Sequence, residues 1–166
     1  MCLSVRRPLM ALRPCVRCSN RSTFVVEARL SMLKTYINRE GTAVLTDYAI
    51  QPVRVLAGTL PGGASTPGTA IPLRLNIFGG EVTRDGVTIR AENHNLNGAL
   101  STTASYLLFL RRSNSPGVYT LYNVGAFELS DRVVQPAARR GNELYKNLPR
   151  TYGDVVAQVT SAARGK

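Results

Sequence analysis

The stretch "TAVLTDYAIQPVRVLAG", residues 42–58, decides the fold. Its first half alternates apolar and polar residues, as a strand with one buried face does. The residues on the buried side are Val44, Thr46, Tyr48 and Ile50. Val53 and Val55 then continue the apolar series on the opposite parity. The strand must therefore absorb an extra residue if both halves are to face one core.

Gln51-Pro52 is the expected place of that extra residue. Proline has no N–H to donate to a strand ladder, and it is tolerated at bulges and sheet edges. We therefore expect a long, bulged and strongly bent strand. A strand of this kind lets a small sheet curl into a barrel and serve two of its walls.

The residues before this stretch predict its hairpin partner. "TFVVEARLSML", residues 23–33, alternates again and continues to about Tyr36. The expected buried face consists of Phe24, Val26, Ala28, Leu30 and Met32. "NREG", residues 38–41, supplies asparagine and glycine for the tight turn between the two strands.

Further strands follow a Gly/Pro/Ser/Thr-rich loop at residues 58–70. The third strand alternates from Ile71 to Ile77 and ends at Phe78-Gly79-Gly80, and a turn at 83–86 precedes a fourth strand at 87–91. "ENHNLNGALSTTAS", residues 92–105, is a polar, turn-rich connection. "YLLFL", residues 106–110, is continuously apolar, which predicts burial on both sides. "VYTLYNV" and "AFELS" provide the last strands.

One helix is expected near the end of the chain, over about 151–163. Thr151 and Asp154 have the spacing of a capping box, in its aspartate form. Val155, Val156 and Val159 share one helical face with Tyr152. A short, valine-rich helix depends on packing against the rest of the fold.

Charge is distributed unevenly along the 166 residues, which carry a formal net charge of +11. Residues 1–22 contain five arginines and no acid, whereas residues 23–136 contain ten basic and eight acidic residues. A polyanion-binding domain usually carries its positive patch on the folded face. We therefore interpret the basic ends as solubilising or targeting segments. The sequence contains no apolar run of about 18 residues, so it predicts no membrane-spanning helix.

The N-terminal segment contains all three cysteines: Cys2, Cys15 and Cys18. Cys15-x-x-Cys18 has metal or redox spacing, but a zinc site needs four ligands and no second pair is present. The apolar stretch "PLMAL" is too short for a secretory signal. We expect a disordered basic leader over residues 1–21, without a bound metal or cofactor.

No catalytic set stands out. The single histidine, His94, lies in a polar loop, and there is no Gly-x-Ser-x-Gly motif. "GGEVTRDG" lacks the lysine and the following helix of a phosphate-binding loop. No spacing selects a catalytic pair among the candidate carboxylates, which are Glu27, Asp47, Glu81, Asp85 and Glu92. We therefore expect no enzymatic activity.

The order of "STFVVEARL", "YINREGTAVLTDYAIQPVRVLAG", "FGGEVTRDGVTI", "YLLFL" and "GVYTLYNV" resembles a group of bacterial proteins that are commonly exported. That group is itself similar to OB-like barrels of the netrin and metalloproteinase-inhibitor type. The resemblance covers about residues 22–130 and implies an OB-like barrel outside the cytoplasm, with no catalytic residues to carry over. This chain departs from the group in lacking a signal peptide and in having Thr103, Ala104 and Ser105 where the group has Gly-Glu.

Together the patterns and the resemblance predict a mainly β fold: a single small antiparallel OB-like barrel or a strongly curved sheet, with a short C-terminal α-helix. The predicted organisation is a leader at 1–21, a β-barrel domain at 22–136 and a basic tail at 137–166 that contains the helix.

The predicted function is that of a non-enzymatic interaction module for a protein or surface partner, at the bacterial cell envelope on the resemblance alone. The alternative is a single-stranded nucleic-acid-binding domain, since OB barrels bind strands on an exposed face. Parity predicts the outward residues of that face to be Leu45, Asp47, Ala49, Gln51, Pro72, Arg74, Asn76 and Phe78. Arg74 and Phe78 are the two that suit a stacking platform.

Overall fold

The computed structural model describes residues 23–59, 73–96, 98–130, 133–137 and 151–164. The predicted leader at 1–21, its cysteines and residues 138–150 of the tail lie outside these ranges. Within them the elements are β1 (Thr23–Ile37), β2 (Val44–Ala57), β3 (Arg74–Phe78), β4 (Gly80–Arg84), β5 (Val87–Ala91), β6 (Ser105–Arg112), β7 (Val118–Ser130), β8 (Val133–Pro136) and α2 (Tyr152–Arg164). Strands β4 and β8 had no counterpart in the sequence prediction.

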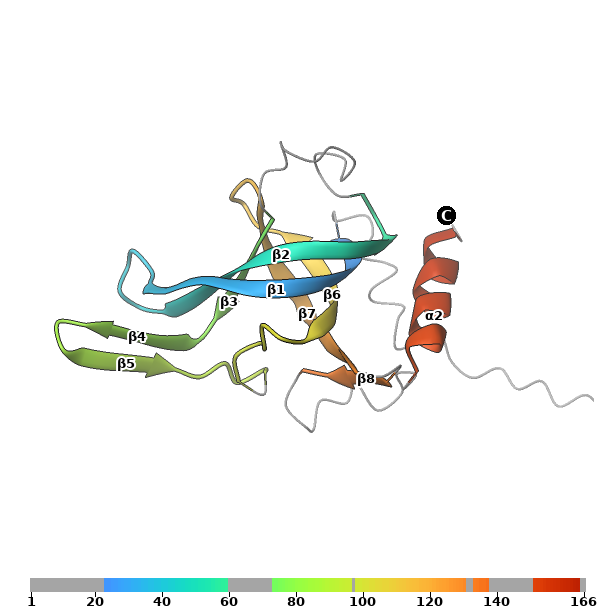
Figure 1. Ribbon diagram of the computed structural model, residues 1–166. Coiled ribbons are helices and arrows are strands. Elements are labelled where there is room, and N and C mark those ends of the chain that lie inside the picture. Colours follow the sequence, from blue (N-terminus) through green and yellow to red (C-terminus); the bar gives the residue numbers. More distant parts are fainter. Residues whose placement is uncertain (1–22, 60–72, 97, 131–132, 138–150, 165–166) are drawn as a thin grey trace, which may run out of the picture.

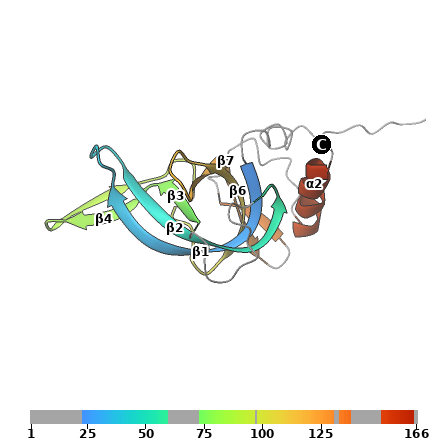
Figure 2. The ribbon, with the colours of Figure 1, turned by 90° about the horizontal axis from the view of Figure 1, so that it is seen from above.

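Most strands form one curved sheet in the order β3-β2-β1-β6-β7-β8, with antiparallel neighbours. Strand β3 also pairs in parallel with β7, through Arg74 opposite Val118 and Leu75 opposite Tyr119. This pairing closes β1, β2, β3, β7 and β6 into a ring, which Figure 2 shows from above. The predicted mainly β fold, with a strongly curved sheet and a short C-terminal helix, is confirmed.

The β1–β2 hairpin is bent by irregularities in its register. Opposite β1, strand β2 has an extra residue at Val53, directly after the expected site at Gln51-Pro52. Strand β1 has an extra residue of its own at Leu33. Bulges increase local twist and bend the strand that carries them. The hairpin therefore curves along the ring and projects beyond it beside the separate β4–β5 hairpin (Figure 1).

Three apolar residues predicted to face the core are exposed instead. Val53 and Val55 are 61% and 38% exposed. Val53 is itself an extra residue opposite β1, and so is Leu56, which is buried with Val25 and with Val155 of α2. Met32 is 60% exposed. Strand β6 pairs with β1 only as far as Arg29, so Met32 lies beyond that neighbour.

The buried side chains form two clusters, one on each side of the β1–β6–β7 sheet. The inner cluster fills the ring, and the outer one lies under α2, which stands beside the ring in Figure 1. Strand β6 serves both, because Tyr106, Leu108 and Leu110 point inward while Leu107 and Phe109 point outward. The predicted burial of this strand on both sides is confirmed.

The connection over residues 92–104 contributes to the core, which its polar composition did not predict. Leu96 and Leu100 are buried among the side chains inside the ring. Two tyrosine hydroxyls hold the segment in place: that of Tyr106 accepts the N–H of Ser101 at 2.8 Å, and that of Tyr48 accepts the N–H of Leu100. The loop therefore closes one end of the ring.

Helix α2 begins one residue after the predicted start, with the expected cap. The Thr151 hydroxyl accepts the N–H of Asp154 at 3.3 Å and lies 2.6 Å from its carboxylate. Val155 and Val159 are buried in the outer cluster, and the Tyr152 hydroxyl donates to Glu27 Oε2 at 2.6 Å. Among the described residues, no helix has the length and apolar character needed to cross a bilayer.

Candidate functional site

The outer face of β1, β2 and β3 carries polar and aromatic side chains in rows that run across the three strands. We call this face the outer platform. In one row Tyr36, Leu45 and Phe78 lie opposite one another, and in the next row Lys34, Asp47 and Asn76 do so. The third row pairs Ala49 with Arg74. The predicted residues Arg74 and Phe78 thus lie on one face of β3, and the predicted neighbour Pro72 lies outside the described residues.

A hydrogen-bond network under the platform holds these rows together. The Asn76 amide donates to Asp47 Oδ1 at 2.7 Å and to the Tyr36 hydroxyl oxygen at 3.1 Å. Asp47 is only 4% exposed although its side chain points to the outer side. A buried carboxylate needs hydrogen-bonding partners. Burial and the nearby charge of Asp47 raise the pKa of Tyr36, which stays a neutral hydroxyl.

Two cations and an exposed ring lie on top of this network. The Lys34 ammonium is 4.6 Å from the centre of the Tyr36 ring, which is a cation–π distance. The charge of Arg74 acts on the Tyr36 hydroxyl and opposes the rise of its pKa. Phe78 is 45% exposed. The platform therefore presents the exposed Phe78 ring and the Lys34–Tyr36 pair, and Asn76 and Asp47 hold the Tyr36 hydroxyl in place.

Sequence reasoning missed Tyr36 and Lys34. Simple alternation from Phe24 places even-numbered residues of this strand inside, but the extra residue Leu33 reverses the parity. The only sign in the sequence is the apolar pair Met32-Leu33, which breaks the alternation. Tyr48, by contrast, was expected in the core and is buried there.

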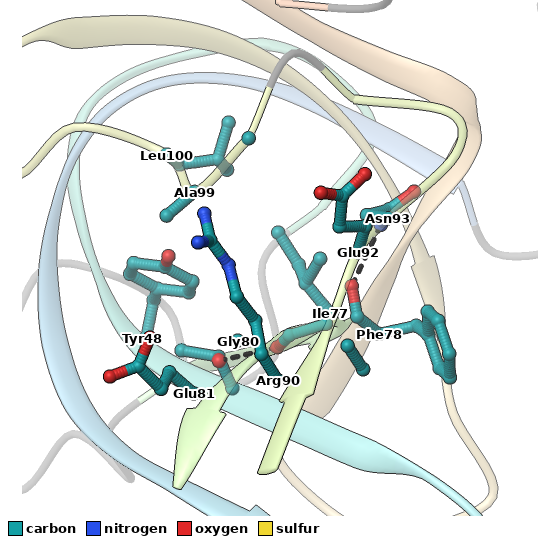
Figure 3. Close-up of a pocket in the computed structure, with 14 residues that line it drawn as sticks. Tyr48, Ile77, Phe78, Gly80, Glu81, Arg90, Glu92, Asn93, Ala99 and Leu100 are labelled. Atoms are coloured by element: carbon teal, nitrogen blue, oxygen red, sulfur yellow. Dashed lines mark hydrogen bonds between the residues drawn. The ribbon is translucent and has the colours of Figure 1, made fainter. Parts of the chain in front are cut away.

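A second candidate site is a pocket of about 500 Å³ between the end of the ring that the 92–104 loop closes and the β4–β5 hairpin, which we call the mouth pocket. It lies between β2, the β3–β4 junction, β5 and the segment at residues 98–100 (Figure 3). Its lining residues are Thr46, Tyr48, Ile77, Phe78, Gly79, Gly80, Glu81, Arg90, Ala91, Glu92, Asn93, Gly98, Ala99 and Leu100. Mouths of β-barrels are common places for small-molecule sites.

The wall of the mouth pocket at the β3–β4 junction is rigidly built. The Thr46 hydroxyl donates to the Gly79 carbonyl oxygen at 2.7 Å, so the Thr35 hydroxyl, 3.1 Å away, donates to Thr46. Gly80 has φ 132°, and a Cβ atom there would collide with both threonine side chains. The Asn93 amide donates to the Phe78 carbonyl oxygen at 2.9 Å, as Figure 3 shows.

The candidate carboxylates do not gather at one place. Glu81 and Glu92 both line the mouth pocket. The other three lie elsewhere: Glu27 accepts from Tyr152, Asp47 belongs to the platform network, and Asp85 lies beside Arg84 at the tip of the β4–β5 hairpin.

His94 is the one candidate metal ligand of the sequence analysis that lies among the described residues. His94 is an exposed residue of the 92–104 loop. In the part of the chain that the structure describes, no three His, Cys, Asp or Glu side chains lie together in a way that could hold a metal ion. Cys15 and Cys18 lie outside that part.

Comparison with protein-family models, with curated proteins and with solved structures gave no match for this chain. The resemblance to exported bacterial proteins stays a prediction.

Proposed function

We propose that the chain is a non-enzymatic binding module, an OB-like barrel that contacts its partner through the outer platform. The observation that carries this proposal is the row of Tyr36, Leu45 and Phe78 across three strands. Its end residue, Phe78, is a large aromatic side chain left open to solvent. Aromatic residues and arginine are enriched at protein interfaces.

The platform is suited to binding because its groups are already ordered. Tyr36, Asp47 and Asn76 are linked by hydrogen bonds, and Lys34 packs against the Tyr36 ring. Side chains that are fixed before binding lose little conformational entropy when a partner arrives. A protein or surface partner is the favoured one, and its location at a bacterial envelope rests on the resemblance alone.

Single-stranded nucleic acid is the second candidate partner, and the same face supports it. Arg74 and Phe78 lie on one strand with Asn76 between them, and aromatic rings beside cations are typical of stacking platforms for bases. The net charge of residues 23–136 is only +2, so attraction of polyanions depends heavily on the basic ends.

A photo-crosslinker tests the proposal on the full chain. Phe78→p-benzoylphenylalanine should give a discrete adduct on irradiation in cells, because position 78 touches the partner. The matched control is Val87→p-benzoylphenylalanine, at another exposed apolar position, on β5. A protease-sensitive adduct specific to position 78 supports a protein partner, and a nuclease-sensitive one supports the alternative. Identical adducts at both positions, or none, contradict the platform as the binding face.

A titration with single-stranded DNA and RNA at two salt concentrations separates the platform from the basic ends. Loss of one stacked ring costs about 1–3 kcal/mol. Phe78→Ala should therefore weaken nucleic-acid binding markedly if the alternative is right, whereas Val87→Ala should not. Binding that falls steeply with salt and ignores Phe78→Ala comes from the ends of the chain.

A further inference from the structure

We infer that the mouth pocket is a binding site for a small organic monoanion with an apolar body. This site is distinct from the outer platform, because the one residue they share, Phe78, directs its ring away from the pocket in Figure 3. The volume of about 500 Å³ lies within the range of about 300–1,000 Å³ that is usual for small-molecule sites.

The inner end of the pocket is apolar and fixed. Tyr48, Ile77 and Leu100 belong to the buried cluster inside the ring and line the pocket. The bond from the Leu100 N–H to the Tyr48 hydroxyl holds two of them in place. An aromatic or aliphatic part of a ligand packs against this surface, because burial of apolar area against a preformed wall drives such binding.

Arg90 supplies the charge. Arg90 lies directly opposite Glu81 in the β4–β5 register, a position from which the two side chains could form a cross-strand ion pair. The two side chains form no ion pair, however, unlike Arg84 and Asp85 near the tip of the same hairpin. Figure 3 shows the Arg90 guanidinium directed into the pocket toward Ala99, while the Glu81 carboxylate points another way.

The charges around Arg90 favour a singly charged ligand. A guanidinium binds a planar oxyanion such as a carboxylate through two parallel hydrogen bonds. Glu81 also lines the pocket and adds negative charge to it. Additional negative charges on a ligand are repelled by this carboxylate, so one oxyanion group on an apolar body fits best.

Binding of two fluorescent probes tests this inference on the full chain. 8-Anilinonaphthalene-1-sulfonate has an aromatic body with one oxyanion group, and N-phenyl-1-naphthylamine has a similar body without charge. The anionic probe should bind saturably with one site per chain. Arg90→Gln should weaken it by at least about tenfold, because a charge-assisted hydrogen bond is lost. The neutral probe should bind weakly and ignore this change.

Two further variants separate the pocket from other surfaces. Arg84→Gln removes an equal charge at the exposed tip of the same hairpin and should leave binding unchanged. Ala99→Phe fills the pocket while the exposed apolar residues elsewhere stay in place, and it should abolish binding. Circular dichroism verifies that each variant is folded. Equal effects of Arg90→Gln and Arg84→Gln, full binding by Ala99→Phe, or no saturable binding by the unmodified chain would each overturn the inference.

Discussion

Leu96→Ala tests whether the 92–104 loop is part of the core or only a connection. Leu96 is 1% exposed and packs inside the ring. The change removes three buried carbon groups at about 0.8 kcal/mol each, and the remaining cavity adds to this loss. We expect the free energy of unfolding to fall by about 3 kcal/mol, which at this chain length lowers the melting temperature by about 10 °C.

Urea denaturation followed by circular dichroism and tyrosine fluorescence measures this loss, since the chain has seven tyrosines and no tryptophan. The matched control is Leu33→Ala, where the leucine is 52% exposed in the β1 irregularity. That change should stay within about 0.5 kcal/mol. A loss at Leu96 no larger than at Leu33 would refute the reasoning, because the loop would then contribute nothing to the interior.

Three further predictions concern the junction, the tyrosines and the helix. Gly80→Ala should cost about 3 kcal/mol in urea denaturation, from strain at positive φ and from the collision with Thr46, whereas Gly86→Ala, with open space around it, should cost about 1 kcal/mol. Burial raises the pKa values of Tyr48 and Tyr106, so the unfolded chain releases these two protons at a lower pH than the folded chain does. The free energy of unfolding that is present below about pH 10 should therefore fall as the pH rises further. A urea midpoint that is flat from pH 8 to 11 would contradict this. Thr151→Ala should lower the free energy of unfolding by about 1 kcal/mol while Thr151→Ser retains the cap, and equal denaturation midpoints for the two would show that the cap is not needed.

Strand alternation predicted those parts of the fold in which each strand keeps one register. Phe24, Val26, Ala28 and Leu30 and the "YLLFL" strand are buried as expected, because their side chains follow the pleat without interruption. The prediction failed at Val53, which is itself an extra residue of its strand, and at Met32, which lies beyond the end of the β1–β6 pairing. Leu96 could not be recognised, since a single leucine in a polar loop has no period to indicate its burial.

The candidate sites were predictable only in part, for the same physical reason. Arg74 and Phe78 lie on a short regular strand, so parity placed them on one face. Tyr36 required knowledge of the Leu33 irregularity. Arg90 joins the mouth pocket because a hairpin folds back against the end of the ring, and no local pattern in the sequence describes such a long-range approach.

The parallel contact that closes the ring has a consequence for how the chain folds. In the described part of the chain two residue pairs join β3 to β7, supported by the bond from the Arg74 N–H to the Gly117 carbonyl oxygen at 2.9 Å. These partners are far apart in the sequence, whereas β1 and β2 meet through a short turn. Forming a distant contact costs loop-closure entropy before it returns any stabilisation. Since seven residue pairs join β1 to β6, another contact between distant parts of the chain, the shorter β3–β7 seam is the weaker of the two, and we expect the Arg74 amide to exchange its hydrogen with solvent earlier than the amides between β1 and β6.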